Sequence, residues 1–363
     1  MSYGPADAID LSQIRRVLVV KLRHHGDVLL ASPVIATLKA RLPHAEVDAL
    51  VYADTAEMLS LHPGLSRLHL VDRKWKSRGV LSHAAAEWRL FSVLKQRRYD
   101  LVLHLTEHPR GAWLARSLGC AWAVAPDHPR KPGFWKRSFT HLYPLPPHGG
   151  RHTVELNLDA LRRIGIQPND QERRLVLVPG AEAEARVEEL LAAHDIVEGG
   201  FIHLHPGSRW QFKCWTPERS AALVDRLQAR GERVVLTAAP DEQELALIAA
   251  IRSRCAQPPV DLSGKLTLKM LAALSRRAKL FVGVDSAPMH IAAAVGTPVV
   301  ALFGPSGETE WGPWQVPHRV VSSREHACRP CGNDGCGGGK VSECLSSISV
   351  ETVLEAIDEL LPR

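Results

Sequence analysis

Short apolar runs alternate with segments of helical periodicity through the first half of the chain. Residues 16–22 are almost continuously apolar, as expected of a strand that is buried on both faces of a sheet. Similar runs follow at 46–51, 68–71 and 99–105. Between them, apolar positions recur at helical spacing at 29–41, 56–61 and 84–97. This alternation predicts a parallel, doubly wound α/β sheet.

The alternation is interrupted at 126–152, a stretch rich in proline, glycine and basic residues that we expect to form an irregular surface segment. A helix is expected at 153–164, and a hinge at 168–170. The second half then predicts strands at 201–205, 233–237, 280–284 and 298–303, and helices at 217–230, 242–254, 268–278, 287–295 and 350–361. We therefore expect two Rossmann-like domains with parallel sheets, at 1–170 and 171–349, facing each other across a deep interdomain cleft. A C-terminal helix segment is expected at 350–363.

Composition places the chain among ordinary globular proteins. Of its 363 residues, 45% are hydrophobic and 23% are charged. No apolar run reaches the ~18 residues of a membrane span, and the first ten residues lack the pattern of a signal peptide. We therefore expect a cytoplasmic location. The formal charge is +9 over residues 1–170 and −3 over the remainder, so the first half is expected to meet an anionic partner.

The first candidate for chemistry is the turn after the strand at 16–22. Gly26 permits a tight turn or a close approach of backbone. Asp27 begins a helical run, where a carboxylate either caps free N–H groups or serves as a general base that takes a proton from an attacking hydroxyl. His24 and His25 lie in the same turn and either bind substrate or stand exposed.

Two further candidates lie in the second half. In 205–218, Gly207 and Ser208 offer donors to phosphate, and Lys213 offers a cation to a diphosphate, unless it is simply a solvated lysine. Thr216 and Pro217 are typical of a helix N-cap followed by the first helical position. The turn at 285–290 begins another helix with small residues, which favours an anion site. Asp285 is expected to cap that helix.

Other sequence features narrow the class of protein. Neither GxGxxG after the first strand nor GxxxxGK[ST] occurs, which disfavours a nicotinamide oxidoreductase and a P-loop ATPase. The basic and aromatic stretch 128–137 suits an anionic lipid surface, with solvated loop as the alternative. A second basic run consists of Arg73, Lys74, Lys76 and Arg78.

Four cysteines cluster near the end of the chain, at Cys328, Cys331, Cys336 and Cys344. Four thiols suffice for a structural zinc ion, but their spacing departs from the usual pair of CxxC motifs. We therefore favour reduced thiols that stabilise the loop by packing, with structural zinc as the alternative.

Taken together, these motifs resemble glycosyltransferase family 9, the ADP-heptose:lipopolysaccharide heptosyltransferases, and within it the heptosyltransferase III branch. The resemblance spans nearly the whole chain and is carried by the motifs at 21–27, 205–215 and 284–290 and by the cysteine loop at 328–344. It implies a GT-B architecture whose first domain binds the acceptor and whose second binds the nucleotide sugar. It also implies inverting transfer of a heptose from ADP-L-glycero-D-manno-heptose to the lipopolysaccharide inner core, with no catalytic metal.

The resemblance also implies roles for individual residues. Asp27 corresponds to the general base of the family. The donor would be bound by Ser208, Lys213, Leu266, Asp285, Ser286, Ala287 and His290, and the acceptor by His25, Gly26, Arg137 and Arg151. The implied partners are ADP-heptose, the inner-core acceptor and the inner face of the inner membrane, which the enzyme would contact peripherally.

Two other readings are open. One is a GT-B transferase that uses a different nucleotide sugar, because donor specificity depends on few contacts. The other is a non-catalytic protein that binds anions or nucleic acid. Nucleic acid is the less favoured ligand, because the basic residues form neither a helix nor an aromatic stacking platform.

Overall fold

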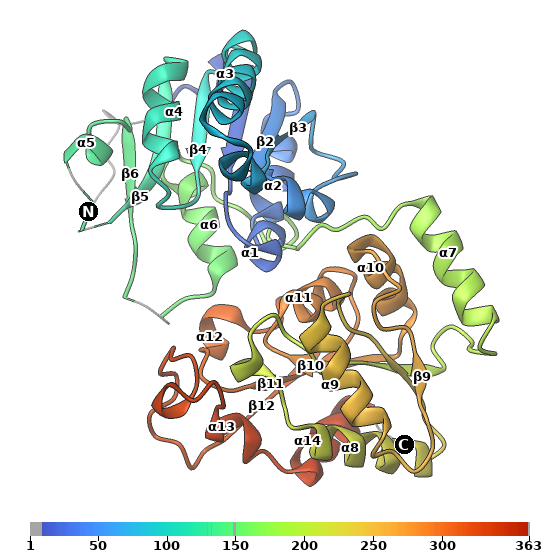
Figure 1. Ribbon diagram of the computed structural model, residues 1–363. Coiled ribbons are helices and arrows are strands. Elements are labelled where there is room, and N and C mark those ends of the chain that lie inside the picture. Colours follow the sequence, from blue (N-terminus) through green and yellow to red (C-terminus); the bar gives the residue numbers. More distant parts are fainter. Residues whose placement is uncertain (1–8, 129, 132, 148–149, 362–363) are drawn as a thin grey trace. The chain divides into compact units, whose positions relative to one another are not determined.

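The computed structural model describes residues 9–128, 130–131, 133–147 and 150–361, without the side chains of Lys76 and Arg78. It divides into two compact units, Met1–Val176 (unit 1) and Leu177–Arg363 (unit 2) (Figure 1). Each unit is built on one six-stranded sheet whose paired strands are all parallel. Parts of the two basic runs, namely Pro129, Pro132 and those two side chains, lie outside the described residues.

Unit 1 has the strand order β3-β2-β1-β4-β5-β6. The strands are β1 (Arg16–Val20), β2 (Glu46–Tyr52), β3 (Arg67–Val71), β4 (Leu101–His104), β5 (Trp122–Asp127) and β6 (His141–Pro144). The helices are α1 (His25–Leu29), α2 (Ser32–Arg41), α3 (Val80–Gln96), α4 (Arg110–Leu118), α5 (Gly133–Lys136) and α6 (Thr153–Arg162). Short 3-10 turns are η2 (Leu11–Gln13), η3 (Ala53–Met58) and η4 (Arg73–Arg78).

Apolar residues of the strands and of α3 and α4 form one buried cluster in unit 1. Leu18 and Val102 from the sheet pack in it with Leu94 of α3 and Leu114 of α4. Helices α2 and α6 pack against each other. One carboxylate is buried against this sheet. Asp48 on β2 accepts hydrogen bonds from the guanidinium of Arg97 at 2.8 Å and from the Tyr99 hydroxyl at 2.7 Å.

Three local expectations for unit 1 are wrong. The segment 126–152 is not irregular throughout, because α5 lies in it and β6 pairs in parallel with β5 at the edge of the sheet. Proline and glycine obscured this short edge strand, where a missing N–H can be tolerated. The helix expected at 29–41 is two helices, α1 and α2, and the one expected at 56–61 is the 3-10 turn η3. Helix α4 and strand β5 were not anticipated.

Unit 2 has the strand order β12-β11-β10-β7-β8-β9. The strands are β7 (Phe201–His205), β8 (Arg233–Leu236), β9 (Val260–Asp261), β10 (Leu280–Val284), β11 (Val299–Phe303) and β12 (His318–Ser322). The helices are α7 (Ala181–Ala192), α8 (Pro217–Ala229), α9 (Glu242–Arg252), α10 (Leu268–Arg277), α11 (Ala287–Ala294), α12 (Glu308–Trp311), α13 (Glu343–Ser346) and α14 (Val350–Leu360), with 3-10 turns η5 (Gln211–Lys213) and η6 (Cys336–Gly338). Helix α14 contributes Val353, Leu354 and Ile357 to the core of this unit.

The order of strands determines where each unit can hold a ligand. In unit 1 the chain turns from one half of the sheet to the other between β1 and β4, and in unit 2 between β7 and β10. Loops that leave the carboxyl ends of strands at such a switch point diverge and leave a crevice between them. Gly283 on β10 reflects close packing there, because a Cβ at this position would lie 2.8 Å from the carbonyl oxygen of His205 on β7.

Candidate functional site

The turn after β1 carries Asp27. Helix α1 begins at His25, and His24 is its N-cap residue, so Asp27 lies within the first helical turn. The alternative that Asp27 caps the helix is therefore wrong. Its side chain is half-buried, and a carboxylate in the first turn is favoured by the helix dipole. The imidazole Nε2 of His25 lies 2.8 Å from the carbonyl oxygen of Asp54, which fixes the ring beside the turn.

A buried lysine lies beside this carboxylate. The Nζ of Lys21 donates to the carbonyl oxygen of Leu105 at 3.1 Å and to Oδ1 of Asn157 at 2.9 Å. Burial lowers the pKa of Lys21 to about 8, and the negative charge of Asp27 partly opposes this shift. Asn157 on α6 also donates to the carbonyl oxygen of Leu30 at 3.0 Å. The lysine thus joins the ends of β1 and β4 across the switch point.

Lys21 and Asn157 were not among the predicted site residues. Lys21 is detectable in principle, because it is a charged residue that directly follows an almost continuously apolar strand. Asn157 offers a weaker signal: it lies on an amphipathic helix that follows the proline-rich segment, and only the fold brings it to β1.

The two arginines expected to bind an acceptor phosphate have different surroundings. Arg137 follows α5 and is exposed. Arg151 precedes α6, and its guanidinium lies 2.8 Å from Asp159 and 3.7 Å from Glu155. Arg162 and Arg173 share these two carboxylates with Arg151, so these three arginines and two carboxylates keep an excess of positive charge.

In unit 2, Lys213 and Asp285 form an ion pair across the switch point. Lys213 belongs to η5, which follows β7, and Asp285 follows β10. Lys213 Nζ lies 2.5 Å from Asp285 Oδ2, and the carboxylate is 7% exposed. The expectation that Asp285 caps α11 is wrong, because the N-cap residue is Ser286, whose hydroxyl lies 3.3 Å from the carbonyl oxygen of Val284. The carboxylate of Asp285 instead forms the ion pair with the ammonium of Lys213.

The remaining donor-site candidates lie at the carboxyl edge of the same sheet. Ser208 is buried after β7, and its Oγ accepts a 3.3 Å hydrogen bond from the backbone of Trp210. Ala287 and the buried His290 belong to α11. Leu266 follows β9 and packs against the cluster under α10. The N-cap prediction for α8 is confirmed, because Thr216 Oγ1 accepts from the backbone N–H of Arg219.

A buried polar cluster beside Ser208 was not anticipated. Thr237 Oγ1, at the end of β8, lies 2.8 Å from Nδ1 of His205 and 2.7 Å from Nε2 of His203. Glu244 on α9 accepts a 2.9 Å hydrogen bond from the backbone of Ala239, and burial raises the pKa of its carboxyl. Burial lowers the pKa of His205 to about 4, so its ring is neutral at physiological pH.

Gly207 explains how this cluster is accommodated. A Cβ at position 207 would lie 2.8 Å from Oε2 of Glu244, so only glycine leaves the carboxylate in place.

Within the described part of the chain, Ser208, Lys213 and the start of α11 all follow two neighbouring strands of one sheet, β7 and β10.

The cysteine loop carries three exposed thiols, Cys328, Cys331 and Cys336, whereas Cys344 on α13 is buried and burial raises its pKa. All four are free thiols. Among the residues that the structure describes, no group of three or more His, Cys, Asp or Glu side chains is arranged to hold a metal ion. Nor does any described helix have both the length and the apolar composition needed to cross a bilayer.

Solved structures identify the architecture. A family 9 glycosyl transferase from Veillonella parvula DSM 2008 superposes with a TM-score of 0.83 at 24% identity, covering 98% of this chain and 99% of that one. The E. coli heptosyltransferase WaaC with ADP superposes with a TM-score of 0.74 at 20% identity, covering 95% and 99%. These similarities confirm the GT-B fold class expected from the sequence, with two Rossmann-like units on parallel sheets.

Sequence comparison identifies the family. The family model described as glycosyltransferase family 9 (heptosyltransferase) matches residues 87–341. A lipopolysaccharide heptosyltransferase 3 from Escherichia coli is 37% identical over 351 residues, which cover 94% of this chain and 98% of the relative. The chain therefore belongs to glycosyltransferase family 9, the heptosyltransferases, as its motifs had indicated.

Proposed function

We propose that the protein transfers a heptose from ADP-L-glycero-D-manno-heptose to the inner core of lipopolysaccharide, with inversion at the anomeric carbon. An acceptor hydroxyl on a core sugar attacks that carbon while its proton passes to Asp27. The bond from the anomeric carbon to the β-phosphate oxygen breaks, and ADP leaves with the electron pair. Because one displacement forms one bond as the other breaks, the configuration inverts.

The observation that carries this proposal is the Lys213–Asp285 pair at the switch point of unit 2, where α/β sheets bind nucleotides. Lys213 supplies a cation for the diphosphate as negative charge builds on departing ADP. Asp285 keeps the ammonium in position. The first backbone N–H groups of α11, at Ser286 and Ala287, add the positive end of a helix dipole. We assign the remaining donor contacts to Ser208, Leu266 and His290.

The assignment of Asp27 as base is supported by its position. It lies at the switch point of unit 1, half-buried, in the first turn of a helix. Within the described residues its carboxylate accepts no hydrogen bond, so its oxygens are free to accept one from a substrate hydroxyl. We assign acceptor contacts to His25, Gly26, Arg137 and Arg151, and to unit 1 as a whole. No step of this proposed transfer requires a metal ion.

The acceptor also suggests where the protein works. Because lipopolysaccharide core is assembled on a lipid anchor, we propose a cytoplasmic protein that contacts the inner face of the inner membrane peripherally. The basic character of residues 1–170 supports this location, because an anionic surface attracts it.

The proposal is tested by measuring ADP release from ADP-heptose, with and without a heptose-terminated lipopolysaccharide core that lacks the third heptose. Release that depends on the acceptor is the expected result, and it should persist with a metal chelator present. Release of a nucleoside diphosphate from another sugar donor, with none from ADP-heptose, would leave the fold and replace the donor. Binding of ADP and acceptor without turnover would favour a non-catalytic anion-binding protein.

A further inference from the structure

Helix α3 of unit 1 is unusually exposed for its length. Of its 17 residues only Leu94 is buried. Leu81 and Trp88, seven positions apart and therefore on one face of the helix, are 87% and 69% exposed. Trp113 on the neighbouring α4 is 62% exposed. We refer to these three side chains as the α3–α4 face.

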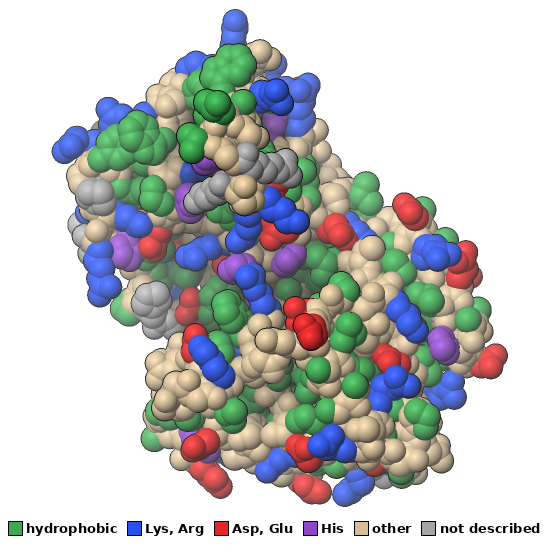
Figure 2. All heavy atoms as spheres, in the orientation of Figure 1, with side chains coloured by type: hydrophobic (Ala, Val, Ile, Leu, Met, Phe, Trp, Pro, Cys, Tyr) green, Lys and Arg blue, Asp and Glu red, His purple; other side chains and the backbone are tan. Residues whose placement is uncertain are grey.

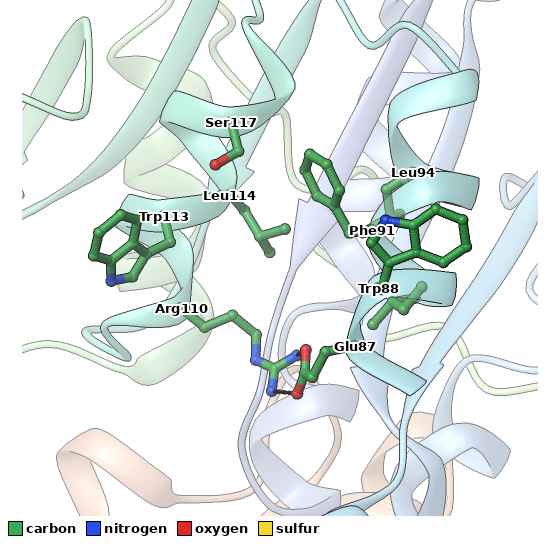
Figure 3. Close-up of a pocket in the computed structure, with 9 residues that line it drawn as sticks. Glu87, Trp88, Phe91, Leu94, Arg110, Trp113, Leu114 and Ser117 are labelled. Carbon is green, nitrogen blue, oxygen red and sulfur yellow. Dashed lines mark hydrogen bonds and ion pairs between the residues drawn. The ribbon is translucent and has the colours of Figure 1, made fainter. Parts of the chain in front are cut away.

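The surface is hollowed on both sides of α3. Between α3 and α4 lies a pocket of about 320 Å³ whose floor includes Phe91, Leu94 and Leu114. Trp88 and Trp113 stand on opposite sides of this pocket, and Arg110 bonds to Glu87 at one end, at 2.7 Å (Figure 3). On the side of β3, a second pocket of about 620 Å³ is lined by residues that include Leu70, Trp75 and Val93. Apolar hollows flanked by tryptophan are suited to lipid chains.

The charge around this face is strongly positive. Residues 73–137 contain fourteen Lys and Arg against four Asp and Glu, whereas the rest of the chain carries a net charge of −4. Figure 2 shows apolar patches flanked by Lys and Arg side chains over unit 1. Arg89 on α3 and Arg116 on α4 are exposed, and Arg116 lies 5.3 Å from the centre of the Phe134 ring.

The four acidic residues of this stretch each have a partner, and together they offset only four of its fourteen positive charges. Glu87 pairs with Arg110, and Asp127 lies 2.9 Å from Lys136. Asp100 accepts backbone hydrogen bonds from Arg15 and Arg16 at 2.8 Å. Glu107 lies 3.6 Å from His128. Carboxylates outside the stretch also pair with Arg73 and Arg97. The remaining excess of arginines and lysines determines the sign of the electrostatic field that an approaching partner meets.

We propose that the α3–α4 face is the surface by which this protein docks on an anionic phospholipid bilayer. Trp88, Trp113 and Leu81 enter the boundary between headgroups and acyl chains, while Arg89 and Arg116 contact phosphate groups. Tryptophan beside basic residues is the composition that lies at membrane interfaces. A second copy of the chain is a poor occupant, because a two-fold pairing would set the same positive surface against itself.

This inference deepens the membrane contact of the proposed function by assigning it to named residues of α3 and α4. It does not depend on the identity of the donor or the acceptor sugar. Its test contains neither substrate, so the docking surface and the proposed transfer can fail separately.

The experiment compares flotation of the full-length protein with vesicles of phosphatidylcholine alone and with vesicles of phosphatidylcholine and phosphatidylglycerol in equal parts. The wild type should bind only the anionic vesicles. The double variant Leu81→Ser/Trp88→Ser should bind at least ~tenfold more weakly, because two apolar side chains no longer leave water. The charge variant Arg89→Gln/Arg116→Gln should lose about fivefold for each arginine at low salt.

The matched control is Val197→Ser/Val341→Ser, which removes two apolar side chains of unit 2 that are 72% and 60% exposed. It should bind vesicles as the wild type does. All four altered positions of the two serine variants are exposed, so circular dichroism should show intact folds. Equal binding of Leu81→Ser/Trp88→Ser and wild type, or equal binding to neutral and anionic vesicles, overturns the proposal. Self-association that this variant abolishes in sedimentation velocity also overturns it, and assigns the face to a second copy.

Discussion

Lys213 and Asp285, 72 residues apart in the sequence, meet at 2.5 Å in the segments that follow two adjacent strands of unit 2, β7 and β10. Unit 1 has a related arrangement at its own switch point, where Lys21 after β1 donates to the carbonyl oxygen of Leu105 after β4. In both units a lysine thus links the segments that follow the two strands between which the strand order reverses. The lysine side chain of unit 2 is 23% exposed, whereas that of unit 1 is buried.

Replacing Lys213 by alanine should weaken ADP binding by roughly tenfold to a hundredfold, because a hydrogen bond to a charged group contributes ~1.5–3 kcal/mol. Turnover should fall at the same time, since the developing charge on ADP loses its cation. Isothermal titration calorimetry with ADP measures the first effect. The control is Lys265→Ala, which removes an exposed lysine close to Leu266. An ADP affinity equal to that of wild type would remove Lys213 from the donor site.

Replacing Asp27 by alanine should reduce turnover by ~10²–10⁴-fold, the usual contribution of a general base. ADP affinity should stay unchanged, because Asp27 belongs to unit 1 and the proposed nucleotide contacts belong to unit 2. The measurement is ADP release under saturating donor and acceptor, with calorimetry in parallel. Asp54→Ala is the matched control: it removes another partly exposed carboxylate near His25. Wild-type turnover in Asp27→Ala would show that another group takes the proton.

Much of the architecture could be predicted because a continuous apolar run indicates a strand that is buried on both faces of a sheet. Strands such as Phe201–His205 and Leu280–Val284 have the limits that the pattern predicted. The pattern could not show β6, because an edge strand with proline lacks that signature. Nor could it show that Asp285 contacts a lysine rather than capping α11, since both interactions suit an aspartate at that position. The partner is determined by strand order, which brings β7 beside β10.

Part of the candidate site could be located in the sequence for the same reason. Turns after apolar strands indicated the positions of Asp27, Lys213 and Ser286, because parallel strands end at one edge of a sheet. Glu244 and Asn157 were not predictable, since each reaches the site from a helix whose orientation depends on packing. Burial, which distinguishes them from other polar helix residues, is a property of the fold.

Acid should destabilise unit 1 through Asp48. Burial raises the pKa of the Asp48 carboxyl, but hydrogen bonds from His69, Arg97 and Tyr99 outweigh burial and lower this pKa to about 2. The pKa of Asp48 is thus lower in the folded protein than its unfolded value of ~3.9. The ionised carboxylate therefore stabilises the folded state above pH ~4, and this contribution, about 2 kcal/mol, is lost as the pH falls toward 2. Urea unfolding between these pH values should show this loss in the wild type and not in Asp48→Asn.

Glu46→Gln is the control for that series. Glu46 is also on β2 and also pairs with Arg97, at 2.7 Å, but its side chain is 49% exposed. Because water screens an exposed pair, this variant should keep most of the wild-type dependence on pH. An identical slope for wild type and Asp48→Asn would mean that the Asp48 cluster contributes nothing to acid stability.

Lys21 should also make stability rise with pH, but over an alkaline range. Burial lowers its folded pKa to about 8, below its ordinary value of 10.5. Below pH 8 the lysine is protonated in both states, and the folded state carries the full cost of a buried ammonium. Between pH 8 and 10.5 the folded protein releases this proton while the unfolded chain keeps it, so stability rises with pH, by up to ~3 kcal/mol. Lys21→Met should remove this rise, whereas the exposed Lys74→Met should preserve it, as measured by urea unfolding against pH. If wild type and Lys21→Met change stability in parallel over this range, the ammonium of Lys21 is solvated rather than buried against Leu105 and Asn157.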